Sequence, residues 1–319
     1  MSDPVLLIDS YAQIFRGYYA VRALSNKNGD PTNAIFAMMR FLMKLEEDYP
    51  GAPGAFVFDK GRPPHRLALA PDYKANRPPC PEDLQAQLPC IRELIAAFGW
   101  NIIEAENTEA DDLIASLALH FEKDQDIRII SADKDIAQVI DEKIEMLVPD
   151  QAGKGFTKRG LKEVEEKFGV PASAIVDYLA MIGDNADNIP GIAGVGPKTA
   201  AQLINRFGSI ENMLAKVHEI ERETLRNKIE QGADLLRKNI ELVRLVTAPP
   251  EGVTWSESHI TRRVVDLDKI RAIAEQKELK SILRDLDKMS AVRPAAAPVP
   301  VIPAKPEEKG EELEQLSLF

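Results

Sequence analysis

Three segments of the chain share one pattern, an apolar run that leads into an aspartate: Val5-Leu6-Leu7-Ile8 before Asp9, Ala55-Phe56-Val57-Phe58 before Asp59, and Ile127-Arg128-Ile129-Ile130 ahead of Asp133. Short runs of this kind, rich in β-branched residues, are typical of parallel strands that are covered on both faces. Because ligands of such sheets bind at the carboxyl ends of the strands, we expect the three aspartates to converge there.

The segments between these runs have helical spacing and supply the covers of the predicted sheet. They are Ala34 to Leu45, Pro81 to Phe98, Ala110 to Phe121 and Asp135 to Val139. Strands that alternate with helices predict an α/β fold, with a mostly parallel central sheet flanked by helices, at residues 1–155.

The second half of the chain has a helical pattern. The predicted helices are Thr157 to Phe168, Ala172 to Ile182, Lys198 to Phe207, Ser209 to Val217 and Ile220 to Val246. They form a C-terminal helical lobe at residues 156–290, in which the amphipathic segment from Asp268 to Leu286 packs back on the body. Residues 291–319, rich in Ala and Pro and then in Glu, are predicted to be a disordered linker.

Composition excludes several classes of protein. The chain has 319 residues, of which 45% are hydrophobic and 29% charged, so it predicts about two globular domains and neither a collagen nor a wholly disordered chain. No stretch approaches the ~20 apolar residues of a membrane span, and the start lacks a secretory signal. Cys80 and Cys90 lack metal-ligand spacing, which predicts free thiols, no zinc and a cytoplasmic location.

Three dense acidic clusters follow: Glu109-Ala110-Asp111-Asp112, Asp133-Lys134-Asp135 and Asp184-Asn185-Ala186-Asp187. A helix N-terminus explains some of these carboxylates, because its dipole favours negative charge. Nine acids at one edge of a fold repel each other unless cations neutralise them, and oxygen ligands without Cys or His favour Mg²⁺ or Mn²⁺. Two such ions ~4 Å apart are the arrangement that promotes phosphodiester hydrolysis.

Five motifs, in order, resemble those of the structure-specific 5′ nucleases, a family that includes flap endonucleases and the 5′→3′ exonuclease domain of bacterial DNA polymerase I. The motifs are Asp72-Tyr73-Lys74-Ala75-Asn76-Arg77-Pro78-Pro79, the clusters at 109–112 and 133–135, the run Gly183-Asp184-Asn185-Ala186-Asp187-Asn188-Ile189-Pro190-Gly191, and Gly194-Val195-Gly196-Pro197-Lys198-Thr199-Ala200. The resemblance runs from Val5 to about Leu286. It implies a PIN-like 5′ nuclease core with an arch at about residues 60–90, a helix-hairpin-helix (H3TH) motif at about 172–207, and a monomer.

The resemblance also implies a set of metal ligands for two Mg²⁺ ions, for which Mn²⁺ would substitute. The ligands are Asp9, Asp59, Glu109, Asp111, Asp112, Asp133, Asp135, Asp184 and Asp187. One departure is Ser10-Tyr11 after the first aspartate, where the family has Gly and a small polar residue. This departure leaves the turn around Asp9 open.

Residues 60–78 are strongly basic, although the whole chain has a net charge of −11. They contain Lys60, Arg62, Arg66, Lys74 and Arg77 with the single acid Asp72. By resemblance, Lys74 and Arg77 contact the scissile phosphate as catalytic residues, Tyr73 stacks on the terminal base, and Arg16 contacts a further phosphate. The alternatives are that the loop is ordinary solvated surface and that Tyr73 fills the core.

The segment Gly191 to Thr199 is predicted to be a helix-hairpin-helix turn and not a phosphate-binding Walker loop. No strand precedes it, and Pro197 suits the first turn of a helix. The residues expected to hold a DNA phosphate are Gly194, Gly196, Lys198 and Thr199. By resemblance, a K⁺ ion bridges this turn to the DNA.

The chain ends in Gln315-Leu316-Ser317-Leu318-Phe319, which resembles the peptide by which bacterial replication proteins bind the sliding clamp. The expected clamp-binding residues are Gln315, Leu316, Leu318 and Phe319. The alternatives are that the match is an incidental apolar end and that this segment is the linker of a longer polymerase.

The acidic clusters predict a divalent-metal-dependent phosphodiester hydrolase, and the resemblance implies a nuclease that acts on 5′ flaps, nicks and RNA primers of DNA in replication and repair. Two alternatives remain: a PIN-like ribonuclease, which shares the strand-end aspartates but does not explain the hairpin motif, and a non-catalytic DNA- and clamp-binding adaptor.

Overall fold

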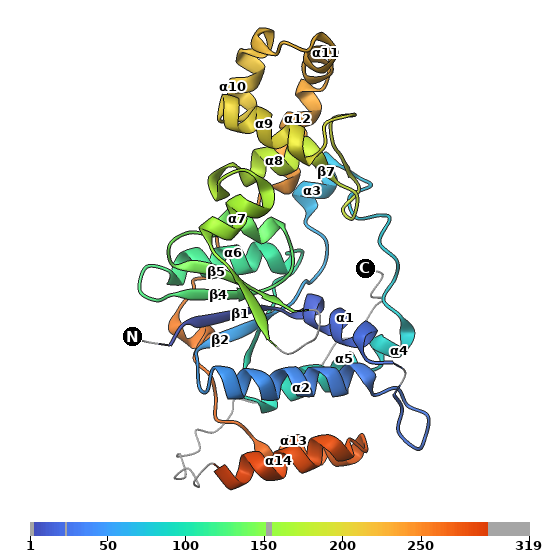
Figure 1. The fold of residues 1–319 in the computed structure, drawn as a ribbon. Helices are drawn as coiled ribbons and strands as arrows, with labels where there is room; N and C mark the ends of the chain where they lie inside the picture. Colours follow the sequence, from blue (N-terminus) through green and yellow to red (C-terminus); the bar gives the residue numbers. More distant parts are fainter. Residues whose placement is uncertain (1–2, 23, 151–154, 293–319) are drawn as a thin grey trace.

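A six-stranded sheet forms the centre of the structure, which is a computed structural model that describes residues 3–22, 24–150 and 155–292 (Figure 1). The strand order is β3-β2-β1-β4-β5-β6. The strands are β1 (Val5–Asp9), β2 (Gly54–Val57), β3 (Asn101–Ile103), β4 (Ile127–Ile130), β5 (Ile144–Pro149) and β6 (Phe156–Arg159). All neighbours are parallel except β5 and β6, so the α/β fold with a mostly parallel sheet is confirmed.

Alternate residues of β1 enter two different hydrophobic cores, one on each face of the sheet. Val5 and Leu7 pack with α6 (Ala110–Phe121), whereas Leu6 and Ile8 pack with α2 (Asn33–Asp48) and α5 (Leu88–Ala97). This period-two alternation buries both faces and leaves Asp9 at the carboxyl end, opposite Val57 of β2. The first helix, α1 (Ser10–Ala20), begins directly after it.

A helical lobe stands above one edge of the sheet (Figure 1). It contains α7 (Leu161–Phe168), α8 (Ile175–Ile182), α9 (Pro197–Phe207), α10 (Ile210–Ala215), α11 (Glu223–Gln231), α12 (Ala233–Val243) and the two-stranded hairpin β7 (Gly183–Asp184) and β8 (Ile189–Pro190). Its apolar residues belong to the same hydrophobic core as Val5 and Leu7 of the sheet, so lobe and sheet are packed together.

Two further helices cover the opposite side of the molecule. They are α13 (Leu267–Gln276) and α14 (Lys280–Val292), which lie below α2 in Figure 1. Ile270 and Ile282 are fully buried in the core that contains Leu6 and Ile8. The expectation that this segment packs back on the body is confirmed.

Several predicted boundaries were wrong. Residues 157–159 form part of strand β6, not a helix, because they pair with β5 and because the neighbouring Phe156 packs edge-on against Phe41, with ring centroids 6.3 Å apart. The sheet therefore extends past residue 155. The long helix expected at 220–246 is interrupted at Gly232, where a Cβ atom would lie 2.3 Å from the side chain of Ile192.

Other elements were missed or mistyped. The sequence patterns did not identify α1, β3 or β5, and the helix expected over Asp135 to Val139 is a 3₁₀ helix, η1. The helix expected over Pro81 to Phe98 is split into α4 (Glu82–Gln85) and α5, and the arch region also contains the short α3 (Pro64–Leu69).

Within the described residues, none of the helices combines the length and the apolar character that a membrane crossing requires. The expected clamp-binding residues and nearly all of the expected linker lie outside the described residues.

Candidate metal centre

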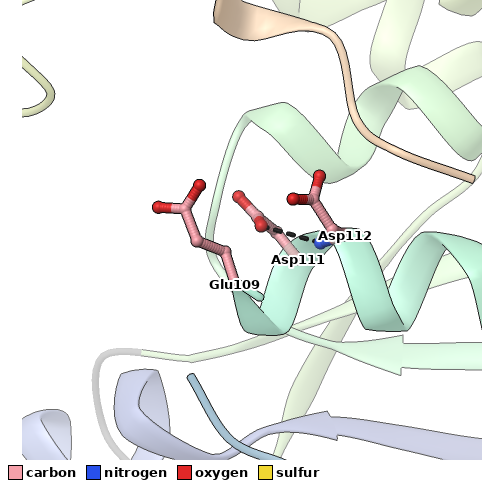
Figure 2. A group of neighbouring side chains, drawn as sticks. All are labelled: Glu109, Asp111 and Asp112. Atoms are coloured by element: carbon pink, nitrogen blue, oxygen red, sulfur yellow. Dashed lines mark hydrogen bonds between the residues drawn. The ribbon is translucent and has the colours of Figure 1, made fainter. Parts of the chain in front are cut away.

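Two groups of three carboxylates lie at the carboxyl edge of the sheet and the adjoining lobe. One comprises Glu109, Asp111 and Asp112, and the other comprises Asp135, Asp184 and Asp187. Within each group, one oxygen from each residue lies within 4.8 Å of the others, which is close enough for one cation to bind all three. Figure 2 shows the first group on the opening turn of α6.

The first group forms because α6 begins among carboxylates. Glu109 is its N-cap, in extended conformation. Asp59, from the end of β2, accepts a hydrogen bond from the N–H of Ala110 (3.1 Å), and Asp111 accepts one from the N–H of Asp112 (2.7 Å). The free N–H groups and dipole of the helix N-terminus favour these acids, so part of the cluster is explained without a metal.

Arg66 neutralises much of the first group, and sequence reasoning placed it wrongly in an exposed basic loop. Its side chain is 2% exposed and forms a bidentate ion pair with Asp112, with N···O distances of 2.7 and 2.8 Å. It also pairs with Glu109. Asp112 accepts a further hydrogen bond from the N–H of Val246 (2.8 Å), so this predicted metal ligand is already well satisfied by protein groups.

A chain of hydrogen bonds connects the ends of β1 and β4. Ser131 donates its hydroxyl to Asp9 (2.9 Å) and accepts from the N–H of Asp133 (3.1 Å), and Asp133 accepts from the N–H of Asp135 (2.9 Å). Asp9 also caps α1 by accepting from the N–H of Ala12 (3.1 Å). The Ser10-Tyr11 departure is therefore compatible with a regular helix start directly after Asp9.

The hairpin β7–β8 presents Asp184 and Asp187. Gly183 has a φ of +72°, and a Cβ atom there would lie 2.3 Å from the N atom of Gly191, so only glycine fits this crossing. Asp184 pairs with Lys134 at 2.8 Å, a lysine that sequence reasoning left without a role. Nearby, Oδ1 of Asp135 is buried without a hydrogen-bond partner, which fits a site for a cation.

The arch loop bridges the two groups. The Tyr73 hydroxyl lies within hydrogen-bond distance of two carboxylates, that of Glu109 (3.2 Å) and that of Asp187 (3.4 Å), to which it can donate. The ammonium of Lys74 pairs with Glu109 and lies 3.7 Å from Asp187, while Arg77 pairs with Asp187 at 2.6 Å. The two predicted catalytic cations therefore face the acids in this conformation.

Tyr73 is 3% exposed and belongs to the hydrophobic core. Its ring thus packs as the alternative interpretation expected, and stacking on a base requires residues 72–77 to move. A main-chain bond from Lys74 N to Asp187 O (3.0 Å) holds this loop in place.

Burial and the neighbouring charges shift the pKa values of several of these acids. Burial, then Asp59 and Asp133, raise the pKa of Asp9 to about 7. Burial, together with Glu109 and Asp112, raises the pKa of Asp111 well above its ordinary value. Burial alone would raise the pKa of Glu109, but Lys74 and Arg66 outweigh it and the pKa is lowered. Such a site favours a proton or a cation.

The other predicted DNA-contacting residues are exposed or half-buried. Lys198 and Thr199 lie in the first turn of α9, which begins at Pro197 as expected, and Gly194 has a φ of +83°. Arg16 donates to the carbonyl of Asp150.

Two family models match the chain: "5'-3' exonuclease, N-terminal resolvase-like domain" over residues 4–169, and "5'-3' exonuclease, C-terminal SAM fold" over residues 170–264. A 5'-3' exonuclease of Aquifex aeolicus is 36% identical over 284 residues, which cover 89% of this chain and 95% of that protein. The thermostable DNA polymerase I of Thermus filiformis is 36% identical over 292 residues, and these span 91% of this chain but only 34% of the polymerase.

Solved structures with the same fold have lower sequence identity. The T5 5'-exonuclease with bound divalent zinc ions has a TM-score of 0.61 at 20% identity, covering 90% of this chain and 99% of that one. The catalytic core of Rad2 in complex with a DNA substrate has a TM-score of 0.61 at 19% identity, covering 89% and 92%. These likenesses establish the fold.

Replacing Arg66 with methionine should strongly destabilise the protein. The substitution roughly keeps side-chain volume but leaves Asp112 without its buried counter-charge and Glu109 with Lys74 alone, and breaking such a pair costs about 3–5 kcal/mol. Urea denaturation in EDTA measures this loss. The control is Arg237→Met, which removes an exposed pair with Glu211 and should cost less than about 1 kcal/mol. Equal losses in the two variants would contradict the assignment.

The metal-free protein should lose stability as the pH rises. Asp9 has a pKa of about 7 in the folded state against 3.8 for the free side chain, so between these values the folded state holds more protons and the free energy of unfolding falls with rising pH. Thermal denaturation in EDTA at pH 5 and pH 8 measures the effect. Added MgCl₂ should raise the melting temperature more at pH 8 than at pH 5, and a shift independent of pH would contradict the expectation.

Proposed function

The chain belongs to the 5′–3′ exonuclease family, and from that membership we propose that it is a structure-specific 5′ nuclease acting on 5′ flaps, nicks and RNA-primer ends of duplex DNA. As a member of this family it is a nuclease, a phosphodiester hydrolase. One observation carries the finer proposal: two carboxylate groups lie side by side, joined by Tyr73 and Lys74.

We assign two Mg²⁺ ions to the nine acids, with Mn²⁺ as a substitute. The donors are all carboxylate oxygens, the ligands that hard divalent cations prefer, and the unpartnered oxygen of Asp135 fits such a role. When bound, the ions supply Lewis acidity toward the phosphate and lower the pKa of water. Asp112 keeps its place in the proposed set, although Arg66 and Val246 already account for both of its oxygens.

Lys74 and Arg77 are the proposed catalytic residues. Their side chains now pair with Glu109 and Asp187, which are members of the two acid groups. Glu109 and Asp187 would hold cations in place of these side chains, and the released ammonium and guanidinium would contact the scissile phosphate. There they would stabilise the charge that develops during hydrolysis.

The remaining proposed DNA contacts surround this centre. The amides of Gly194 and Gly196, with Lys198 and Thr199, would hold a backbone phosphate of the duplex at the start of α9, with a K⁺ ion bridging the turn. Arg16 would contact another phosphate. Tyr73 would stack on the terminal base after the arch loop opens.

We also propose a protein partner, the bacterial sliding clamp. Gln315, Leu316, Leu318 and Phe319 would bind the bacterial sliding clamp, which would raise the concentration of the nuclease at its substrate. The protein would act as a monomer in the cytoplasm.

Replacing Asp111 with asparagine should abolish cleavage without preventing DNA binding. The change keeps the side-chain shape and removes one charge from the first acid group, so we expect turnover of an end-labelled 5′-flap duplex with Mg²⁺ to fall on the order of 100-fold or more. Gel-shift measurements in Ca²⁺ report flap binding. Asp268→Asn, at an exposed position of α13, is the matched control.

The same assay separates the alternatives. Cleavage of single-stranded RNA in preference to the flap would indicate a PIN-like ribonuclease. Flap binding without any Mg²⁺-dependent product would indicate an adaptor, and unchanged turnover by Asp111→Asn would refute the assigned centre.

A further inference from the structure

The segment Asn239–Val246 contains none of the nine acids, yet it contacts elements of both acid groups. It comprises the last residues of α12 and the three residues that follow this helix. Side chains and main-chain atoms of this segment form hydrogen bonds to α8, β8, η1, α3 and α6, which lie far apart in the sequence.

Asn239 connects the segment to the hairpin that presents Asp184 and Asp187. The side chain is fully buried, and its amide nitrogen donates to the carbonyl of Ala180 in α8 (2.9 Å) and to the carbonyl of Pro190 in β8 (2.8 Å). A single side chain therefore fixes the helix that enters the hairpin and the strand that leaves it.

Gln138 connects the segment to η1, the 3₁₀ helix that carries Asp135. Its amide nitrogen donates to the carbonyl of Val243 (2.7 Å), and its oxygen accepts from the N–H of Leu245 (3.2 Å). This reciprocal pair fixes η1 at two points, three residues from Asp135.

Arg66 and Val246 connect the segment to the first acid group. The guanidinium of Arg66 donates to the carbonyls of Leu242 (3.1 Å) and Arg244 (3.0 Å) while it binds Glu109 and Asp112. Val246 donates its N–H to Asp112 directly (2.8 Å).

We propose that Asn239–Val246 is a shared positioning element that sets the separation of the two acid groups, with Asn239 and Gln138 as its positioning residues on the side of Asp135, Asp184 and Asp187. This inference rests on the proposed two-metal function. Two cations acting on one phosphate need their ligands held to within about 0.5 Å, and groups on separate strands and loops need a common support for that. Without the amide groups of Asn239 and Gln138, the main-chain carbonyls that accept their hydrogen bonds would lose these partners. Because a buried carbonyl without a partner is unfavourable, the hairpin and η1 would shift.

The test measures metal binding in the full chain without DNA. Asn239→Leu removes both donated hydrogen bonds without adding charge, and Gln138→Glu keeps the acceptor for Leu245 but loses the donor for Val243. Titration with Mn²⁺, followed by calorimetry at a temperature where every variant is folded, should show affinity about 10- to 100-fold weaker in each variant. The increase in melting temperature caused by Mn²⁺ should shrink in parallel.

The matched control is Asn205→Leu. Asn205 also donates its amide to a main-chain carbonyl of the lobe, that of Gly169 (2.7 Å), but it is exposed and Gly169 lies outside the elements that carry the nine acids. Its Mn²⁺ affinity should equal that of the wild-type protein. Should Asn239→Leu fail to fold, Gln138→Glu decides alone, because Gln138 is only half-buried.

Wild-type Mn²⁺ affinity in folded Asn239→Leu and Gln138→Glu would overturn the inference, as would an equal loss in Asn205→Leu. Failure of the proposed function is distinguishable, since a wild-type protein that binds Mn²⁺ but leaves the flap uncut refutes the nuclease assignment and not the positioning role.

Discussion

Repulsion among carboxylates is the constraint that governs this structure. The fold directs nine acids toward one edge of a sheet, and the burial or half-burial of all of them except Asp133 removes much of the water that would screen them. Buried or half-buried cationic side chains form ion pairs with three of these acids: Arg66 with Asp112, Lys74 with Glu109, and Lys134 with Asp184. Burial, and after it the neighbouring carboxylates, still raise the pKa values of Asp9, Asp111 and Asp135, so these positions favour a proton or a cation.

The sheet brings together the acids that follow its strands, and the helical lobe adds the acids of the hairpin β7–β8. Parallel strands covered on both faces can place side chains of β1, β2 and β4 at a common edge with little effect on the core. The hairpin β7–β8 approaches that edge from a different part of the chain, and its position depends on helix packing. The continuous core between sheet and lobe makes this approach a fixed feature of the fold.

Much of this arrangement could be predicted from the sequence, because the strand-end aspartates and the acidic motifs are patterns of side-chain type. The burial of Arg66 could not be predicted, because a basic residue between prolines looks the same in a solvated loop as in an interior ion pair. Strand β6 was missed because Phe156–Arg159 is short and alternates weakly, and because its partner β5, the preceding strand in the chain, was missed as well. The contacts of residues 239–246 are made largely by main-chain carbonyls. Because every residue type has such a carbonyl, no sequence pattern predicts these contacts. Ser131 gave one overlooked signal, a hydroxyl directly after an apolar run.

In the proposed metal centre, the pairing of Lys74 with Glu109 would make the resting arch loop compete with a metal ion for the same carboxylate. A phosphate or a loop movement that drew this lysine away would strengthen the binding of a cation, and by thermodynamic reciprocity a bound cation would strengthen the binding of the phosphate to the same degree. Ion and nucleic acid would then be heterotropic effectors of each other, and in the absence of both one lysine side chain would act as an internal inhibitor.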